Sequence, residues 1–421
     1  NGYLASQYTG IVGARACVQK PQACDLGRGI ETDRDAGTIA FHLTKPDPEF
    51  LYKLAFAMAA AVPSGATKAP LPATGPYMTR SFTPNRSWVL VRNPRFHEWS
   101  RDAQPDGYPD RIELTAGPPN QVAGLERGAA DVLLAPPVGR IDELARRLAN
   151  QLHIDPVGAT FALVMNTRVA PFNRLQARRA LNYALDRSRI ARLTGSSLTA
   201  QPTCQILAPT IPGYRPYCPY TLNAGPSGSW TAPDLARAQQ LVAASGTKGA
   251  KVTLLLSPPT ADQPTPQIGR YVVSVLDQLG YRASFRVIDN TSSAGVGELG
   301  NSRRRPQIGW FTWFQDNPTP ANFIDLLLTC ASFVPASAAN INVSEFCNRS
   351  IDAQVQRAHS LQQTDPAAAG EGWGRVDREL VDQAPWAPLY NPRSATALGA
   401  RVGNYQYHPF WTVLLDQLWV R

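Results

Sequence analysis

With 421 residues, the chain is long enough to bury a large core, and its length predicts two or three domains. Its 43% hydrophobic and 17% charged residues are those of a globular protein and exclude a disordered one. The net charge of +9 does not indicate nucleic-acid binding, because the arginines are dispersed apart from one cluster at residues 303–305 and no basic face carries stacking aromatics.

The first 167 residues predict loops followed by a strand-rich region. The expected elements are a strand at 38–43, a helix at 48–59, a hairpin at 75–94, a strand at 110–117, and a short helix with a strand over 120–137. The hairpin is the clearest, because apolar and polar residues alternate on both sides of the turn at 83–86. The longest apolar run, at 54–63, is too short to cross a bilayer. Residues 1–10 lack a signal-peptide pattern, so we expect a mature form or a fragment.

From about residue 168 the pattern changes to alternating helices and strands. Residues 171–195 predict one helix that ends at Gly195, and residues 231–246 predict a second helix capped by Thr231. The expected elements that follow are a strand at 251–257, a helix at 267–280, strands at 281–289 and 307–314, and helices at 349–362 and 366–383. This order is typical of a βαβ unit with parallel strands.

The six cysteines form three local couples. They allow fifteen connectivities, but thiols that are neighbours in loops favour Cys17–Cys24, Cys204–Cys218 and Cys330–Cys347. We expect no metal site, because the sequence has no Cys-x-x-Cys and no histidine near a couple. Reduced, buried cysteines are the alternative. Disulfides would indicate a protein outside the cytoplasm.

No catalytic motif is assembled in the sequence. Gly-x-Ser-x-Gly, His-Glu-x-x-His and a phosphate-binding loop are all missing, and the five histidines are scattered. We therefore expect neither enzyme activity nor a cofactor. A secreted hydrolase on an α/β scaffold is the alternative from a different class.

Four segments carry a family resemblance. They are "TGPYMTRSFTPNRSWVLVRNPRFHEW" (74–99), "GLERGAADV" (124–132), "MNTRVAPFNRLQARRALNYALDR" (165–187) and "NYQYHPFWTVLLDQLWV" (404–420). In this order they resemble the family 5 extracellular solute-binding proteins, the receptors of dipeptide and oligopeptide ABC importers. The match covers residues 30–421. Well over a hundred residues that begin the family's members have no counterpart here, and the segment 17–24 is unlike the better-known members.

The resemblance implies an α/β fold like that of the type II periplasmic binding proteins, with two lobes around a cleft. We expect residues 73–167 and 393–421 in lobe I and residues 168–392 in lobe II, with residues 1–72 a remnant of the family's domain II. Crossings near residues 167 and 392 would let the lobes close.

The stretch "WFTWFQDNPTPANF" (310–323) resembles a family motif at Trp313, Asp316, Pro320 and Phe323. The resemblance implies that Asp316 receives the terminal ammonium of a peptide and that the preceding strand pairs with the peptide backbone. The expected ligand-binding residues are Trp310, Thr312, Trp313, Phe314, Asp316 and Asn317. Alternatively, the aromatics are ordinary sheet packing and the carboxylate caps a turn. Trp310 stands where some oligopeptide receptors carry an arginine for the peptide carboxylate, and whether residues 303–305 substitute for it stays open.

The resemblance further implies an extracytoplasmic receptor, in the periplasm or as a cell-surface lipoprotein. It would act as a monomer and deliver peptides to ABC permease subunits in the membrane. Relatives with this fold also bind other ligands, so a metal chelate, haem or an oligosaccharide is the alternative.

Overall fold

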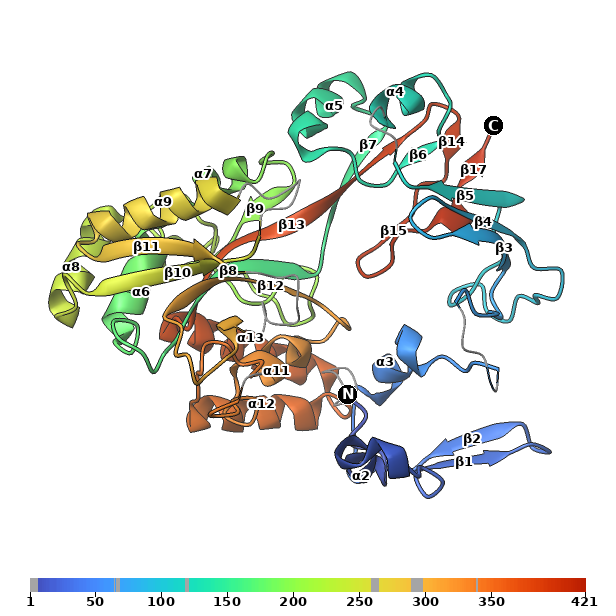
Figure 1. Ribbon diagram of the computed structural model, residues 1–421, viewed down its shortest axis with the longest axis horizontal. Helices are drawn as coiled ribbons and strands as arrows, with labels where there is room; N and C mark the ends of the chain where they lie inside the picture. The colour runs from blue at the N-terminus through green and yellow to red at the C-terminus, as the bar shows by residue number, and fades with distance from the viewer. Residues whose placement is uncertain are drawn as a thin grey trace. The chain divides into compact units, whose positions relative to one another are not determined.

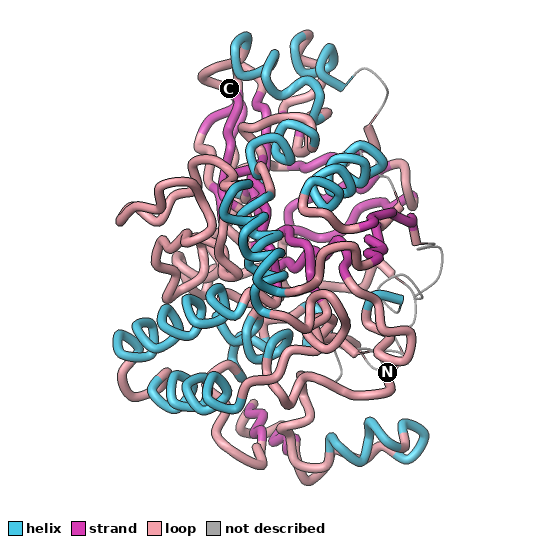
Figure 2. Tube along the Cα trace, turned by 90° about the vertical axis from the view of Figure 1, so that its left-hand side faces the viewer, coloured by secondary structure: helices cyan, strands magenta, loops and turns pink. Residues whose placement is uncertain are grey.

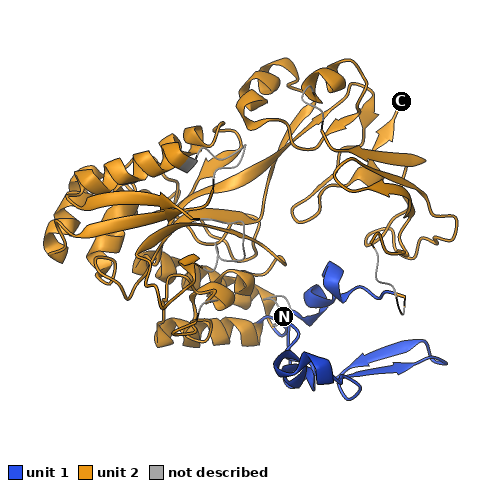
Figure 3. Ribbon diagram, in the orientation of Figure 1, with its two compact units in different colours: residues 1–62, 362–364 blue, residues 63–361, 365–421 orange. Residues whose placement is uncertain are grey.

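The structure is a computed structural model that describes residues 7–63, 65, 69–117, 121–258, 265–288, 298–337 and 340–421. The chain divides into two compact units (Figure 3). Unit 1 holds residues 1–62 and 362–364, and unit 2 holds residues 63–361 and 365–421. None of the described helices combines the length and the apolar character that a membrane span requires.

Unit 1 is small and mostly irregular. Its elements are α2 (Ala14–Gln19), η1 (Pro21–Ala23), β1 (Ile30–Asp33), β2 (Thr38–Phe41), α3 (Phe50–Leu54) and η2 (Ala57–Ala59). The strands β1 and β2 form an antiparallel hairpin, and Phe41 packs edge-on against Phe50 with ring centroids 5.3 Å apart. The helix predicted at 48–59 is shorter than expected, because Phe56 is extended and buried and separates α3 from a 3-10 turn.

The largest element of unit 2 is an eight-stranded mixed sheet. Its strands are β6 (Val132–Leu133), β7 (Leu152–Pro156), β8 (Ala159–Met165), β9 (Ala200–Pro202), β10 (Lys251–Leu256), β11 (Arg282–Val287), β12 (Ile308–Phe314) and β13 (Trp386–Leu398). The order is β11-β10-β12-β8-β13-β6, and β7 and β9 also pair with β13. Strand β10 pairs in parallel with both β11 and β12, which confirms the predicted βαβ unit.

Helices cover both faces of this sheet (Figure 1). On one face lie α6 (Leu175–Ala184), α7 (Arg187–Leu193), α8 (Leu235–Ser245) and α9 (Thr265–Gln278), and on the other lie α11 (Ile324–Leu328), α12 (Arg349–Leu361) and α13 (Pro366–Gln383). Because both faces are covered, every residue of strand β8, "ATFALVM", is buried. Leu163 and Met165 face the first core and Ala162 and Val164 the second, as the two-residue period of a strand requires. Figure 2 shows the chain from a perpendicular direction, with helices and strands in different colours.

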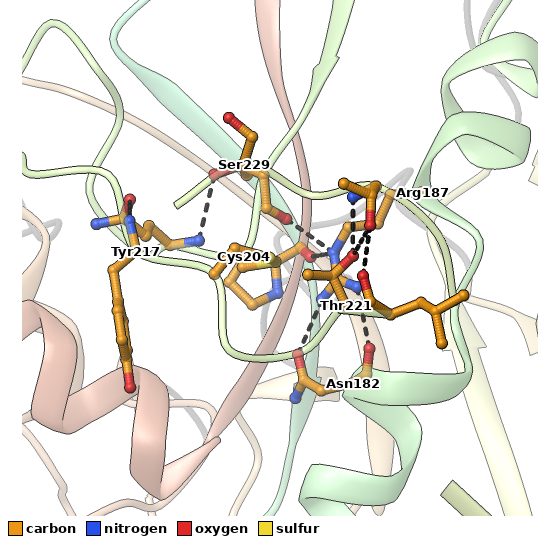
Figure 4. Close-up of a disulfide and its surroundings, with 12 residues drawn as sticks. Asn182, Arg187, Cys204, Tyr217, Thr221 and Ser229 are labelled. Carbon is orange, nitrogen blue, oxygen red and sulfur yellow. Dashed lines mark hydrogen bonds between the residues drawn. A yellow bond between two sulfur atoms is a disulfide. The ribbon is translucent and has the colours of Figure 1, made fainter. Parts of the chain in front are cut away.

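The family-like segment 165–187 has a structural role. Arg178 donates to the carbonyls of Phe172 and Gln383, and Asn182 donates to the carbonyl of Trp386. Arg187 donates to the carbonyls of Thr203 and Pro388 and to both oxygens of Asn182, beside the Cys204–Cys218 disulfide (Figure 4). These side chains therefore fasten α6 and α7 to β13 and to the disulfide loop.

Two helix predictions need correction. The helix expected at 171–195 is broken into α6 and α7, because Leu185 is extended and Asp186 caps a new helix by accepting from Arg189 N–H. The cap of α8 is Asp234, which accepts from Arg237 N–H, and not Thr231. Thr231 instead bonds to Thr221 and to the carbonyl of Leu222.

The remaining elements of unit 2 come mainly from residues 77–147 and 402–420. They are β3 (Tyr77–Thr83), β4 (Ser87–Arg92), β5 (Arg111–Thr115), α4 (Gln121–Glu126), η3 (Val138–Arg140), α5 (Ile141–Arg147), η4 (Pro320–Asn322), β14 (Val402–Gly403), β15 (Tyr407–His408), β16 (Thr412–Val413), η5 (Leu415–Gln417) and β17 (Trp419–Val420). Strands β3 and β4 form the predicted hairpin, and β5 extends it to a three-stranded antiparallel sheet. The long strand β13 pairs first with β8 and β9, and then with β7 and β6.

Candidate functional site

Strand β12 has one paired edge and one edge that is open over most of its length. Its register with β8 runs from Ile308 to Phe314, whereas its register with β10 ends at Gly309. Beyond Gly309, no strand of the described residues pairs with the second edge. Residues 310–314 thus offer about 16 Å of strand edge, at about 3.3 Å per residue.

The hydrogen bonds at the two ends of β12 indicate which backbone groups face the open edge. Gln315 N–H donates to Gly158, and Gln307 accepts from Asn166 N–H, both on the β8 side. In an antiparallel ladder these groups alternate, so the even-numbered residues direct theirs the other way. The N–H and C=O groups of Thr312 and Phe314 therefore face the open edge, where an extended ligand backbone could pair with them.

The aromatic side chains predicted for the site are divided between the two faces of the sheet. Trp310 is only 8% exposed and lies in the core, with its ring centroid 6.0 Å from that of Phe161. Trp313 packs on the opposite face, stacked on Phe311 at 6.3 Å. Phe314 is 54% exposed. Of the three predicted aromatics, Phe314 has the most exposed side chain, Trp313 is partly exposed and Trp310 is buried.

Asp316 begins the turn that follows β12 and is partly exposed. Its backbone N–H donates to Asn322 Oδ1 at 2.8 Å, and its Oδ2 accepts from Asn322 Nδ2 at 3.1 Å. The predicted residue Asn317 is buried, and its Oδ1 accepts from Thr319 Oγ1 at 2.6 Å. The carboxylate is thus at the end of the open strand edge, whereas the side chain of Asn317 is directed into the turn.

Asn322, which forms hydrogen bonds to Asp316, is not among the binding residues predicted from the sequence. The motif matched the positions on both sides of it, Pro320 and Phe323, but assigned it no role. The sequence did contain one signal for its role. Asn322 stands six residues after Asp316, in a turn that begins at Pro320. Such a turn brings an amide back toward the end of the preceding strand, but the sequence alone does not specify which side chain returns.

Gln315 connects the end of β12 to two other segments. Its side chain is 8% exposed, and its Nε2 donates to the carbonyl of Pro409 at 3.3 Å. A Cβ atom on Gly158 would lie 2.0 Å from Gln315 Oε1, so any larger residue there would require the Gln315 side chain to move. The carboxylate site is therefore built against both the β7–β8 junction and the loop between β15 and β16.

The other predicted features can be placed directly. The disulfides are Cys17–Cys24, Cys204–Cys218 and Cys330–Cys347, as the spacing favoured. Arg305 donates to the carbonyl of Arg168 at the start of β12, at the opposite end of the strand from Asp316. Among the described residues, no group of three His, Cys, Asp or Glu side chains could hold a metal ion.

The fold and this site can now be compared with known proteins. Residues 25–334 match a protein-family model, that of the middle part of the bacterial extracellular solute-binding proteins, family 5. The chain belongs to this family, whose members are extracellular solute-binding proteins.

Three relatives illustrate the similarity. "Heme-binding protein A" of Haemophilus influenzae is 27% identical over 315 residues, which are 72% of this chain and 52% of that protein. "Probable di/tripeptide-binding protein 5" of Pseudomonas aeruginosa is 23% identical over 426 residues, or 93% of this chain and 72% of that protein. The solved structure of "Clavulanic acid biosynthesis oligopeptide binding protein 2" has a TM-score of 0.78 and 23% identity, covering 96% of this chain and 73% of that chain.

These likenesses confirm the predicted α/β fold of the type II periplasmic binding proteins. The matched part of the chain spans about half, 52%, of the length of Heme-binding protein A.

Proposed function

We propose that this chain is a non-catalytic receptor that binds peptides and delivers them to the permease subunits of an ABC importer. It would act as a monomer outside the cytoplasm, in the periplasm or at the cell surface. The family membership and the names of two of the relatives support a solute receptor with a peptide ligand.

One observation carries the peptide assignment: an open strand edge that ends at a partly exposed, positioned carboxylate. A peptide main chain gains hydrogen bonds by lying along such an edge, and one fixed charge at its end sets the register. In this proposal Asp316 receives the terminal ammonium, the backbones of Thr312 and Phe314 pair with the peptide, and the ring of Phe314 contacts its side chains.

A double-mutant cycle tests the proposal. Asp316→Asn keeps the shape of the side chain and removes its charge. A hydrogen bond to a charged group contributes about 1.5–3 kcal/mol, so the affinity for a peptide should fall roughly ten- to a hundredfold. Acetylating the peptide's N-terminus should cost the wild type a similar factor and the variant little more, because both changes remove one interaction. Isothermal titration calorimetry measures the four affinities.

Two outcomes would contradict the assignment. If the two losses of binding free energy, from Asp316→Asn and from N-acetylation, are additive, the carboxylate and the ammonium do not interact. Undiminished binding of acetylated peptides to the wild type would exclude an ammonium site altogether.

Haem is the second candidate ligand, because the relative with 27% identity is named for haem binding. Native mass spectrometry of the purified chain, followed by titration with haemin and with a tripeptide mixture, separates the two ligands. A haem complex that persists in Asp316→Asn, with no peptide captured by the wild type, would favour haem.

A further inference from the structure

The buried amide of Asn322 makes three hydrogen bonds in the turn after β12. Asn322 is the last residue of η4 and is only 4% exposed. Its Oδ1 accepts from the backbone N–H of Asp316 at 2.8 Å and from Trp313 Nε1–H at 3.3 Å. Its Nδ2 donates to Asp316 Oδ2 at 3.1 Å. One side chain therefore holds the carboxylate, its backbone and the neighbouring indole.

We infer that Asn322 is a positioning residue of the ammonium site, an inference that rests on the proposed function. A partly exposed carboxylate can rotate about two side-chain torsions, and fixing it only when a ligand arrives would cost affinity. The bond from Nδ2 fixes one carboxylate oxygen in advance, and the bond to the backbone N–H fixes the main chain that carries it. The ligand then meets a preorganised acceptor.

The chemical type of this residue matters as much as its place. An amide donates to the carboxylate and does not itself neutralise the negative charge. An arginine or lysine at position 322 would orient the carboxylate equally well but would compete for its charge. A neutral donor on a buried turn therefore suits a site that selects for a free, charged N-terminus.

The same turn contains a matched control. Thr319 Oγ1 donates to Asn317 Oδ1 at 2.6 Å, and both side chains are buried. Thr319→Val keeps the side-chain shape and removes one buried hydrogen bond of the turn. The bonds between Asn322 and Asp316 are not affected directly. A loss that arises only from loosening the turn should appear in this variant as well.

Two substitutions at position 322 separate the contribution of the Nδ2 donor from that of the Oδ1 acceptor. Asn322→Ala removes all three hydrogen bonds. Asn322→Asp keeps an oxygen that can accept from Asp316 N–H and Trp313 Nε1–H, but replaces the donor by a second carboxylate oxygen. Two carboxylates about 3 Å apart share a proton, so the charge at the site then depends on pH.

The experiment uses the 421-residue chain and a tripeptide mixture, presented before and after N-acetylation. Native mass spectrometry identifies a captured tripeptide, and calorimetry gives its affinity in both forms for each variant. The readout is the ratio of the two dissociation constants, which reports on the ammonium and not on overall folding. Thermal unfolding of each variant is measured in parallel.

The wild-type ratio should be roughly ten- to a hundredfold. Asn322→Ala should reduce it by about tenfold, corresponding to about 1.4 kcal/mol, and Thr319→Val should leave it close to the wild-type value. In Asn322→Asp the ratio should rise between pH 5 and pH 7, as the shared proton is released and the site gains a second negative charge, whereas the wild-type ratio should change little over this range.

The possible failures are distinguishable. If the wild type captures no tripeptide or ignores acetylation, the ammonium site itself is wrong, whatever the variants do. If the wild type discriminates and Asn322→Ala keeps the full ratio, the carboxylate needs no positioning and only this inference is overturned. An Asn322→Asp profile that parallels the wild type would also overturn it, since that variant is expected to keep the bonds that hold the turn.

Discussion

Arg187 is a fully buried cation whose hydrogen-bond partners among the described residues are neutral oxygens. Burying a charge is costly unless its donors are all satisfied. Here four backbone and side-chain oxygens surround the guanidinium, and the carbonyl of Asn182 belongs to the last turn of α6, the negative end of the helix dipole. Burial lowers the pKa of Arg187 to about 10. The residue is therefore charged at neutral pH and serves as a structural fastener.

Arg187→Met should destabilise the protein by about 2–4 kcal/mol, because it leaves several buried acceptors without a donor. The arginine is charged in both the folded and the unfolded state below about pH 9, so this difference should stay constant between pH 5 and 8. Urea unfolding of both proteins measures it. Arg192→Met, at an exposed position of the same helix, is the control and should change the stability little. Similar losses of stability in Arg187→Met and Arg192→Met would argue against a structural role of the buried hydrogen bonds of Arg187.

Single residues show how far the sequence could predict the candidate site. The carboxylate could be proposed because an acid follows an aromatic strand and two prolines follow the acid. The burial of Trp310 could not be predicted, because two-residue alternation along a strand does not reveal that helices cover both faces of this sheet. Asn322 was missed because its role depends on the path of a turn, which brings together groups six residues apart.

Among the elements, helix α13 holds the disulfide loop through one buried acid. Asp377 is 1% exposed, accepts from Gln205 Nε2 at 2.7 Å and accepts from Leu207 N–H at 3.2 Å. Burial raises the pKa of Asp377 to about 6, and the hydrogen bonds that it accepts only partly offset this. The folded state therefore favours the neutral acid more than the unfolded state does.

This pKa predicts a pH dependence with a definite sign. The folded protein holds a proton on Asp377 between about pH 4 and pH 6 that the unfolded chain has lost, so stability should fall as the pH rises through this range and be constant above it. Asp377→Asn removes the titration. The unfolding free energy of the variant minus that of the wild type should therefore rise by up to about 3 kcal/mol from pH 4 to pH 7.

Urea unfolding at a series of pH values measures this difference. Glu379→Gln, at an exposed position of the same helix, should give a flat difference. A flat profile for Asp377→Asn would mean that the buried carboxyl does not take up a proton on folding.

The elements themselves were largely predictable. The strand-helix order over 251–314 gave parallel pairing, because a strand-helix-strand connection returns the chain in the same direction. The break between α6 and α7 was missed because residues 171–195 keep helical periodicity across it. It is caused by the inward turn of Arg187, whose partners Thr203 and Pro388 lie farther along the chain, and by the local cap that Asp186 forms with Arg189 N–H.

At the scale of the whole molecule, two-lobe closure remains a proposal, with residues 73–167 and 393–421 in one lobe and residues 168–392 in the other. The features that bear on it are strand junctions. β13 changes its partners from β9 to β7 between Pro392 and Arg393, and the chain passes from β7 to β8 at Val157 and Gly158. Val157 N–H donates to the carbonyl of Pro392, so the two junctions lie side by side. We propose this pair as the crossing about which the lobes move, which replaces the predicted crossing near residue 167 by one at residues 157–158 and places β8 in lobe II.

Gly158→Ala tests this crossing. An added Cβ would lie 2.0 Å from Gln315 Oε1, and Gln315 is held by its bond to Pro409 and by the bond from its own N–H to Gly158 at 2.7 Å. Overpacking of this kind costs about 1–3 kcal/mol, measurable by urea unfolding. Gln315→Ala in the same chain should recover most of the loss, because it removes the clashing atom.

The ligand response separates a hinge from a merely tight junction. If the lobes close about Gly158, small-angle scattering should record a compaction of the wild type on saturation with its tightest tripeptide and a smaller one of Gly158→Ala. Gly124→Ala is the matched control, because an added Cβ in α4 meets no atom within 4 Å; it should raise the stability by at most about 1 kcal/mol and leave the compaction close to the wild type. Equal compaction of Gly158→Ala and the wild type, with the stability loss present, would place the moving joint elsewhere, since a clash at a true crossing must alter the closing equilibrium and not only the folding one.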